Sequence, residues 1–476
     1  MTDTKWRPDL SMREGPKFRA LATAIREAVH SGDLPPGTRL PAMRDLAWSL
    51  GMTPGTVARA YQIAAAEGAI DSHVGRGSFV TQPDAAPGLI QPLIDSAGSG
   101  HEGPADLRSP QLPDLGQTAA IATAMHEAAE QTGADLLNYP PLAGDLACRQ
   151  ALLDWLGQEA TGNAGPDDMV LTHGGQSAIL LILSICLVGE RPRVMAEGLS
   201  YPGLRHAARL LRADIAPVAQ DTQGMLPEHM DRVARHSGAR LVFLTPSAQN
   251  PTAGMMTTER REALIRVARH HDLQIIEDES YSNRPGSLRA PDAEPALRML
   301  APERVWQIAG LSKILSAGLR FGALICPSHR AAIARLAAQH SYFGLSRPLT
   351  LTVTRLLNDP QSQRLAGAVM TEFVSRAAIA RRILPADRLT TQPALPFVWL
   401  TLPAGWRASR FAQAAAAQGV LVRPADEFAA VSGTAQPAAN AVRIALAGNL
   451  SHQALADALW TLRRLYDTPQ GEDMVV

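Results

Sequence analysis

Hydrophobic positions near the N-terminus recur with the spacing of helices. Over residues 18–29 they follow one another every three or four residues, which places them on one face of a helix. A shorter helical segment covers residues 43–50, and a third begins after Thr53, a residue type favoured at helix N-termini. Strand-like segments at 69–73 and 78–80 follow. The pattern therefore predicts three helices and a β-hairpin.

A tight turn containing Gly51 separates the second and third predicted helices. Two helices joined in this way form a helix-turn-helix, whose second helix enters the DNA major groove. Arg76 lies at the tip of the predicted hairpin, where it could reach a minor groove or a phosphate. We therefore interpret residues 1–82 as a DNA-binding domain. A small helical domain that binds another protein is the alternative interpretation.

Beyond residue 104, strand-like and helical patterns alternate, which is typical of α/β proteins with a mostly parallel sheet. Residues 83–104 are instead rich in proline and glycine and have few periodic apolar positions, as expected of a linker. We predict a large α/β domain over residues 105–476. Its small C-terminal lobe would begin near residue 345 and contain a strand at 397–401 and an extended segment at 419–422.

Composition describes an ordinary globular protein of 476 residues, with 46% hydrophobic and 19% charged residues and no formal net charge. The longest apolar run, 178–188, is too short to cross a bilayer, and the N-terminus lacks a signal-peptide core. Cys148, Cys186 and Cys326 match no metal-ligand spacing. We expect a cytoplasmic protein with reduced thiols, no metal and no membrane contact.

Lysine is rare in this chain, and its placement suggests covalent chemistry. Of 45 lysines and arginines only three are lysines, and Lys313 is the one that lies beyond residue 18. A Schiff base with an aldehyde requires a primary amine, which arginine cannot supply. Arg320, seven residues further on, suits the phosphate of an aldehyde cofactor. A surface lysine without such a role is the alternative.

Other motifs fit a pocket for pyridoxal phosphate. Asp278 ends an apolar strand, where a carboxylate could keep the pyridine nitrogen protonated, and Asn250 follows another buried strand and could bind the phenolic oxygen. Glycines in the segment 172–177 precede an apolar helix and could bind the phosphate. Tyr201 could stack on the ring. Taken singly, Asp278 could be a solvated loop acid, Asn250 a turn residue, the 172–177 segment an ordinary glycine turn and Tyr201 a core aromatic.

The N-terminal segment resembles the winged helix-turn-helix domain of GntR-type bacterial regulators over residues 17–81. The similarity lies in the runs 32–47, 56–61 and 75–80. It implies a double-stranded DNA operator as partner. The residues implied to contact DNA are Arg44 on the phosphate backbone, Thr56 and Arg59 on the recognition face, and Arg76 on the wing. Pro54 departs from the arginine that the family often has there.

Residues 105–465 resemble fold type I aminotransferases, because short motifs occur in the same order along the chain. They are Tyr139 to Gly144, Gly174-Gly175-Gln176, Tyr201-Pro202, Asn250-Pro251-Thr252, Asp278 with Tyr281, Ser312-Lys313 and Arg443-Ile444. The resemblance implies pyridoxal 5'-phosphate as cofactor, with Lys313 as the Schiff-base lysine and Asp278 on the pyridine nitrogen. The other implied contacts are Asn250 and Tyr281 on the ring oxygen, Tyr201 on the ring face, and Gly175, Gln176, Ser312 and Arg320 on the phosphate.

Two further roles follow from the same resemblance. Tyr139 would reach the phosphate of the neighbouring subunit in a homodimer, and Arg443 would bind the carboxylate of an amino-acid effector. A surface arginine on a strand is the alternative for Arg443. Two residues depart from the family pattern: Gly310 replaces a hydroxyl residue, and Ala253 stands where glycine is usual.

A GntR-type domain followed by an aminotransferase-like domain resembles the MocR-type transcriptional regulators. This implies a homodimeric DNA-binding regulator that senses an amino acid or amine by imine exchange at Lys313. Because Lys313 and Asp278 are also the groups that transamination needs, an active aminotransferase with an appended DNA-binding domain is the alternative. A DNA-binding protein that has lost its cofactor is a third possibility.

Overall fold

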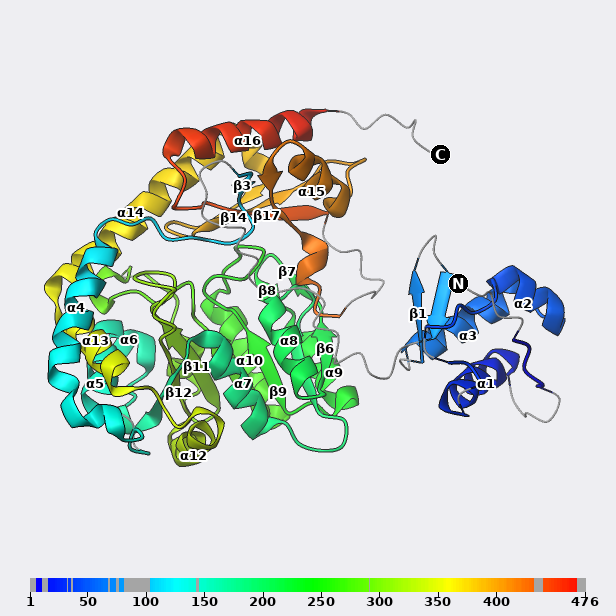
Figure 1. The fold of residues 1–476 in the computed structure, drawn as a ribbon, viewed down its shortest axis with the longest axis horizontal. Coiled ribbons are helices and arrows are strands. Elements are labelled where there is room, and N and C mark those ends of the chain that lie inside the picture. The colour runs from blue at the N-terminus through cyan, green and yellow to red at the C-terminus, as the bar shows by residue number, and fades with distance from the viewer. Residues whose placement is uncertain are drawn as a thin grey trace. The chain divides into compact units, whose positions relative to one another are not determined.

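The computed structural model describes residues 6–10, 16–31, 33–35, 37–66, 69–73, 77–80, 103–142, 145–290, 292–431 and 440–468. The chain forms two compact units, residues 1–90 and 91–476 (Figure 1). The predicted linker lies outside the described residues apart from its last two positions. Among the helices that the structure describes, none has the length and apolar character needed to span a membrane.

The first unit has the predicted order of three helices and a hairpin. Its elements are α1 (Lys17–Ser31), α2 (Met43–Leu50), α3 (Pro54–Ala66), β1 (Ile70–His73) and β2 (Gly77–Val80). The two strands pair in antiparallel fashion, so the predicted winged helix-turn-helix arrangement is confirmed.

Local sequence explains how these helices start, stop and pack. Gly51 adopts a φ of 61° and ends α2, a left-handed conformation that glycine adopts without steric cost. The Thr53 hydroxyl accepts a hydrogen bond of 3.2 Å from the backbone N–H of Thr56, which caps α3 as predicted. Leu21 and Ile25 of α1 are fully buried in one core cluster with residues of α2, α3 and the hairpin.

A seven-stranded sheet forms the centre of the second unit, in the order β4-β12-β11-β10-β9-β5-β6. The strands are β4 (Met169–Thr172), β5 (Arg193–Glu197), β6 (Asp214–Val218), β9 (Leu241–Leu244), β10 (Gln274–Asp278), β11 (Val305–Gly310) and β12 (Gly322–Ile325). Only β12 runs against its neighbours, β4 and β11. The predicted mostly parallel α/β sheet is therefore confirmed.

Helices cover both faces of this sheet, which explains why strands such as β9 are apolar throughout. Side chains that alternate along a strand point to opposite faces. Phe243 packs in the cluster that contains residues of α7 (Gly175–Cys186), α8 (Pro202–Leu210) and α12 (Ala331–Tyr342). Val242 packs in the cluster with α9 (Pro227–Ser237), α10 (Thr258–His270) and α11 (Leu297–Leu300).

Further helices of this unit pack against one another, and one of them, α5 (Leu146–Leu156), contacts β4. They are α4 (Gln117–Thr132), α5, α6 (Gln158–Thr161), α13 (Arg347–Asn358) and the long α14 (Pro360–Ile383). Helix α13 packs against α4 and α5, and α14 contacts α13 and α16 (His452–Asp467).

A smaller antiparallel sheet carries the C-terminal part of the chain (Figure 1, orange and red). Its strand order is β13 (Leu389–Thr390), β14 (Phe397–Thr401), β17 (Ala441–Ala445) and β16 (Arg423–Pro424). Helices α15 (Ala408–Ala417) and α16 pack in the same core cluster as these strands. The predicted strand at 397–401 coincides with β14, and β15 (Val420–Leu421) pairs in parallel with β3 (Ala105–Asp106). The start of the lobe near residue 345 stays a prediction.

Candidate functional site

The candidate cofactor residues come from loops that follow adjacent strands of the large sheet. Asp278 ends β10, Lys313 lies in the turn after β11, and Asn250 follows β9. The carboxyl ends of parallel strands meet at one edge of a sheet, where ligands bind in open α/β proteins. The structure therefore brings Asn250 and Lys313, which lie 63 positions apart in the chain, to the same end of the sheet.

The Asp278 carboxylate is held by the residue two positions further on. Its Oδ1 accepts hydrogen bonds from the Ser280 backbone N–H (3.0 Å) and from the Ser280 hydroxyl (2.5 Å). Burial raises the pKa of Asp278, whereas the Ser280 hydrogen bonds and the positive charge of Lys313 oppose that rise. Its Oδ2 accepts no hydrogen bond from the described residues, so it is available to a pyridine nitrogen. The sequence interpretation missed Ser280, although Asp-x-Ser is a spacing at which such local bonds form.

Lys313 lies in a tight turn that follows β11. The carbonyl oxygen of Leu311 accepts the backbone N–H groups of Ile314 and Leu315, which fixes the turn on both sides of the lysine. The Lys313 Nζ lies 5.4 Å from the ring centre of Tyr281. Within the described residues, neither the Lys313 amine nor the Ser312 hydroxyl makes a hydrogen bond. A primary amine is thus presented beside an aromatic ring and near the half-buried carboxylate of Asp278.

The N-terminus of α7 and Arg320 form an anion-binding corner. The first backbone N–H groups of a helix lack partners inside it and attract anions. The Arg320 guanidinium donates to the His173 carbonyl oxygen at 3.2 Å, next to this helix start. A Cβ atom at Gly174 would lie 2.8 Å from Arg320 Nη2, so only glycine leaves the guanidinium in place. Gly175 begins α7, and a Cβ atom there would lie 3.3 Å from Ser280 Oγ.

Gln176 and Tyr201 lie side by side at Gly203. Gln176 Nε2 donates to the Gly203 carbonyl oxygen at 2.9 Å. A Cβ atom at Gly203 would lie 2.2 Å from both Gln176 Oε1 and Tyr201 Cε1, so this position requires glycine. Burial raises the pKa of Tyr201, and the negative charge of Asp278 raises it further. Tyr201 is therefore within electrostatic reach of the candidate cofactor residues, and Gly203 is a residue that the sequence interpretation missed.

Asn250 and Arg443 form a direct pair across the two lobes. Arg443 Nη1 donates to Asn250 Oδ1 at 2.6 Å. This leaves the Asn250 Nδ2 group without a partner among the described residues, and free to donate to a ligand oxygen. Tyr281 packs edge-on against Phe397 with ring centres 5.0 Å apart.

Arg443 is a buried cation without a carboxylate partner. It is 4% exposed, so the alternative of a surface strand arginine is wrong. Its Nη2 donates to the Arg108 carbonyl oxygen at 2.8 Å, and its buried Nε has no hydrogen-bond partner. Burial lowers the pKa of Arg443 to about 10. Among the described residues no carboxylate pairs with it, so the site lacks the negative charge that a buried guanidinium favours.

A buried network behind the pocket went unnoticed in the sequence. Gln249 Nε2 donates to Glu197 Oε2 at 3.1 Å and to the Leu199 carbonyl oxygen at 2.7 Å, while its Oε1 accepts the Thr252 N–H at 2.8 Å. Gln249 thereby joins the turn that carries Asn250 to the loop that precedes Tyr201. Burial raises the pKa of Glu197 to about 7, against the effect of the Gln249 and Thr245 hydrogen bonds. The only sequence feature that points to Gln249 is that it directly precedes the Asn250-Pro251 motif.

The structure gives a local reason for Gly310 but places Ala253 in a conformation that favours glycine. Ala253 adopts a φ of 59°, the left-handed conformation for which glycine is preferred. A Cβ atom at Gly310 would lie 3.3 Å from the Phe321 carbonyl oxygen, so β12 leaves little room for a larger residue there.

Tyr139 lies on an exposed apolar surface. It is 79% exposed and stacks on Phe343 with ring centres 4.9 Å apart. Leu136 and Leu137 nearby in the chain are exposed as well. Such a surface suits contact with another subunit. The role of Tyr139 toward a neighbouring subunit's phosphate stays a prediction.

The candidate DNA-contacting residues are accessible in the first unit. Arg44 on α2 and Arg59 on α3 are exposed, and Thr56 near the start of α3 is half-buried. The Arg59 guanidinium lies 4.2 Å from the ring centre of Phe18, so α1 supports its position. Arg76 lies outside the described residues.

Pyridoxal 5'-phosphate fits the residues gathered at this end of the sheet. The glycine cradle at Gly174 and the arginine beside it match a phosphate, and the unengaged Oδ2 of Asp278 matches a protonated ring nitrogen. The unpaired Lys313 amine matches an aldehyde. These features lie together at one edge of the sheet, as a single cofactor requires.

Two family profiles match the chain. The profile "Aminotransferase class I and II" matches residues 104–461, and the profile "Bacterial regulatory proteins, gntR family" matches residues 18–80. Together they account for both compact units.

Individual proteins are similar over about two thirds of the chain's length or more. The uncharacterized HTH-type transcriptional regulator YdeF of Bacillus subtilis is 27% identical over 97% of each chain. The probable rhizopine catabolism regulatory protein MocR of Rhizobium meliloti is 27% identical over 66% of each chain. The crystal structure of LysN, an alpha-aminoadipate aminotransferase from Thermus thermophilus complexed with N-(5'-phosphopyridoxyl)-L-leucine, is 25% identical. It superposes with a TM-score of 0.67 and covers 77% of this chain and 92% of its own. The chain therefore belongs to the aminotransferase class I and II family, with pyridoxal phosphate as its cofactor, and its N-terminal gntR-family domain gives it the arrangement of a MocR-type regulator.

Proposed function

We propose that the protein is a transcriptional regulator that binds operator DNA through its first unit and senses an amino acid in its cofactor pocket. The observation that best supports this proposal is that a gntR-family domain precedes an aminotransferase domain that contains both Lys313 and Asp278. YdeF and MocR, which are named as regulators, support this combination. The proposal includes the residue roles predicted from the sequence.

The chain's own residues would hold the cofactor as follows. Arg320 and the first N–H groups of α7, with Gln176 and Ser312, would bind the phosphate. Asp278 would hold a proton at the ring nitrogen through its Oδ2, and Asn250 and Tyr281 would donate to the ring oxygen. When bound, pyridoxal 5'-phosphate supplies an aldehyde for which the amines of Lys313 and of an effector compete.

Arg443 supports an amino acid over a simple amine as effector. Its guanidinium is buried without an ion pair among the described residues, and its Nε has no hydrogen-bond partner. A carboxylate would supply both the missing charge and the missing acceptor. An amine that lacks a carboxylate would leave the Arg443 guanidinium unpaired, and would bind more weakly than the corresponding amino acid.

Contacts between the lobes suggest how effector binding could reach the rest of the protein. The backbone N–H of Ser200 donates to the Phe428 carbonyl oxygen at 2.8 Å, and Phe428 ends η6 (Ala425–Phe428) in the small lobe. Arg443 lies over the Phe428 ring at 4.7 Å. An effector that binds Arg443 therefore acts on a contact between Tyr201's loop and the small lobe, and can favour one lobe arrangement over another.

A homodimer would carry this change to two DNA-reading domains. The exposed apolar surface that includes Leu137 and Tyr139 supports such an assembly. Two reading domains predict an operator with paired half-sites, and phosphate contacts predict an affinity that falls with salt.

An active aminotransferase is the second candidate. It is favoured by the retention of Lys313, Asp278 and Tyr281 and by the similarity to the alpha-aminoadipate aminotransferase LysN. The first unit would then have only an accessory role.

One experiment separates the two functions. The full-length holoprotein selects DNA from a random duplex library, and its affinity for the selected DNA is measured with each of a panel of amino acids and their decarboxylated amines. We expect one amino acid to change both the cofactor absorbance and the DNA affinity, the latter by about 5- to 150-fold. Steady conversion of amino acids and 2-oxo acids, with unchanged DNA affinity, would favour the aminotransferase.

A further inference from the structure

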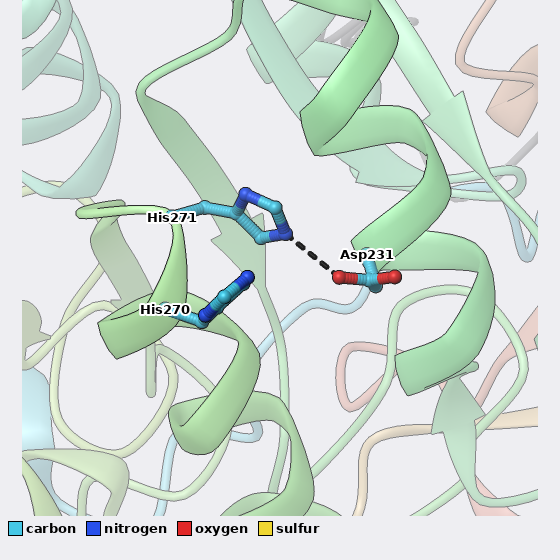
Figure 2. Close-up of side chains that lie close together, drawn as sticks. All are labelled: Asp231, His270 and His271. Carbon is cyan, nitrogen blue, oxygen red and sulfur yellow. Dashed lines mark hydrogen bonds and ion pairs between the residues drawn. The ribbon is translucent and has the colours of Figure 1, made fainter.

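Three potential metal ligands gather on the large unit, away from the cofactor pocket. Asp231 on α9 faces His270 and His271 at the end of α10, and their ligand atoms lie within 4.8 Å of one another (Figure 2). His271 Nε2 and Asp231 Oδ1 are 2.7 Å apart. The two imidazole rings lie nearly perpendicular, with centres 4.6 Å apart. Elsewhere in the part of the chain that the structure describes, no other such group occurs.

This group lies at the amino-terminal ends of the parallel strands, opposite the carboxyl ends where Lys313 lies. Helix α10 ends at His270, and β10 starts at Gln274 and runs to Asp278 at the cofactor edge. The five residues of β10 span about 13 Å from the first Cα to the last, at a rise of about 3.3 Å per residue. The histidines therefore have no part in the cofactor contacts described above.

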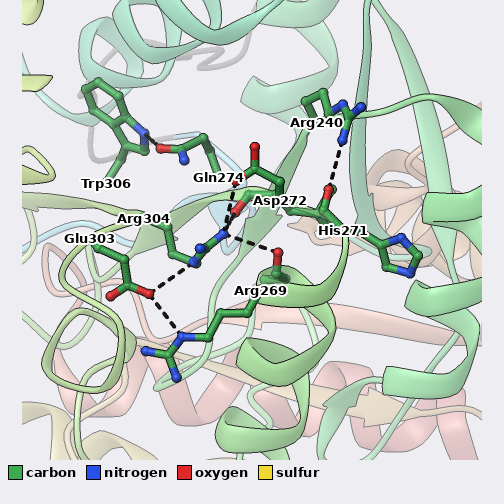
Figure 3. Close-up of polar contacts among 10 residues, drawn as sticks. Arg240, Arg269, His271, Asp272, Gln274, Glu303, Arg304 and Trp306 are labelled. Atoms are coloured by element: carbon green, nitrogen blue, oxygen red, sulfur yellow. Dashed lines mark hydrogen bonds and ion pairs between the residues drawn. The ribbon is translucent and has the colours of Figure 1, made fainter.

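The backbone that carries both histidines is held by arginines (Figure 3). Arg304 Nη1 donates to the carbonyl oxygens of Ala268 (3.2 Å) and Leu273 (3.0 Å), on either side of the pair. Arg240 Nη1 donates to the His271 carbonyl oxygen at 3.0 Å. Metal sites need well-positioned ligands, and these bonds fix the backbone from which both imidazoles project.

Asp231 is oriented by a second contact. Its Oδ2 forms an ion pair with Arg235 Nη2, one turn further along α9, at 2.7 Å. The Oδ1 atom is thereby left facing the imidazoles. A metal ion at this point would take the place of the proton that His271 and Asp231 share, because a ligating imidazole must be unprotonated at the binding nitrogen.

We propose that Asp231, His270 and His271 bind a divalent transition-metal ion of the Zn²⁺ class. Two imidazoles and one carboxylate suit Zn²⁺ or Co²⁺, whereas Mg²⁺ and Ca²⁺ favour all-oxygen sites. Bonds of about 2.0–2.2 Å place tetrahedral ligand atoms about 3.4 Å apart. His271 and Asp231, now 2.7 Å apart, would therefore separate slightly as the ion enters, and the exposed His270 side chain would rotate to complete the site. The ion would link α9 to α10 and stabilise this side of the large unit.

The test uses the full-length holoprotein. Zn²⁺ binding is measured by calorimetry, and Co²⁺ binding is measured by its visible absorption. The unfolding temperature is measured with and without Zn²⁺. We expect one ion per chain at this site, a higher unfolding temperature with Zn²⁺, and an unchanged cofactor absorbance band. His270→Ala should weaken binding at least 10-fold.

The variants are chosen so that loss of binding differs from loss of fold. His270 is exposed and makes no hydrogen bond among the described residues, so its removal leaves the packing intact. Asp231→Asn keeps an oxygen acceptor for His271 but removes the charge. His340→Ala, at an exposed histidine of α12, is the matched control and should bind as the parent does. Binding that survives both His270→Ala and Asp231→Asn, binding lost equally in His340→Ala, or no saturable binding at all would overturn the proposal.

Discussion

The two units use arginine in opposite environments. In the first unit, Arg44 and Arg59 lie on the surface, where phosphate groups of DNA can replace water and counterions. In the second unit, Arg443 is buried and bonded to Asn250, where loss of water strengthens each polar contact. Each exposed arginine contributes its own increment to DNA affinity. The energetic contribution of a buried arginine depends instead on all the groups that contact it. Substitutions should therefore act locally in the first unit and cooperatively in the second.

The largest effect should come from Lys313→Ala, which removes the amine needed for covalent attachment. The cofactor absorbance band of the Schiff base should disappear, and borohydride should leave no adduct on the large unit, as mass spectrometry would check. Lys17→Arg, in the first unit, is the control and should keep the band. Full retention of the adduct in Lys313→Ala would refute the assignment of the cofactor lysine.

Arg443→Gln should weaken binding of an amino-acid effector by about 2–5 kcal/mol, the usual cost of removing one member of a buried charge pair. Spectral titration with an effector and with its decarboxylated amine measures this loss. The amine should bind both proteins equally, because it never contacts Arg443. Equal losses for both ligands would mean that Arg443 acts only by supporting Asn250.

Glu197→Gln should change how stability depends on pH. The folded-state pKa of Glu197 is raised to about 7 from 4.5, so the folded protein holds a proton that the unfolded chain has released between those values. Stability should therefore fall as pH rises from about 5 to 7, by about 3 kcal/mol from this group. Urea unfolding at several pH values should show a flatter profile in Glu197→Gln. Glu190→Gln, at an exposed position, should follow the parent, and identical profiles for all three would contradict the argument.

The smallest effect should come from Arg44→Ala. We expect DNA affinity to fall by about 1 kcal/mol and the slope of log affinity against log salt to decrease by about 1. The cofactor band and the response to an effector should stay as in the parent, since the substitution lies in the other unit. A changed response to the effector would show that the units are coupled through Arg44.

Much of the architecture was evident from the sequence. Apolar spacing alone located α2 and β14 at their observed bounds, because the period of a helix or strand is a local property of the chain. The scarcity of lysine identified Lys313 as the candidate Schiff-base residue, because composition can be counted without a structure. The helix cap at Thr53 was equally local.

Only the tertiary structure decided which distant side chains meet. Arg443 reaches Asn250 from another sheet, and Gln249 bonds to Glu197 across neighbouring strands. Asp231 and the two histidines come from separate helices. Such contacts follow from strand order and helix packing, which are set by burial of the whole apolar core, and no short stretch of sequence contains them. The sequence by itself thus determined the elements and the candidate chemistry, and the fold decided the partners, because contact between distant residues exists only once the chain has packed.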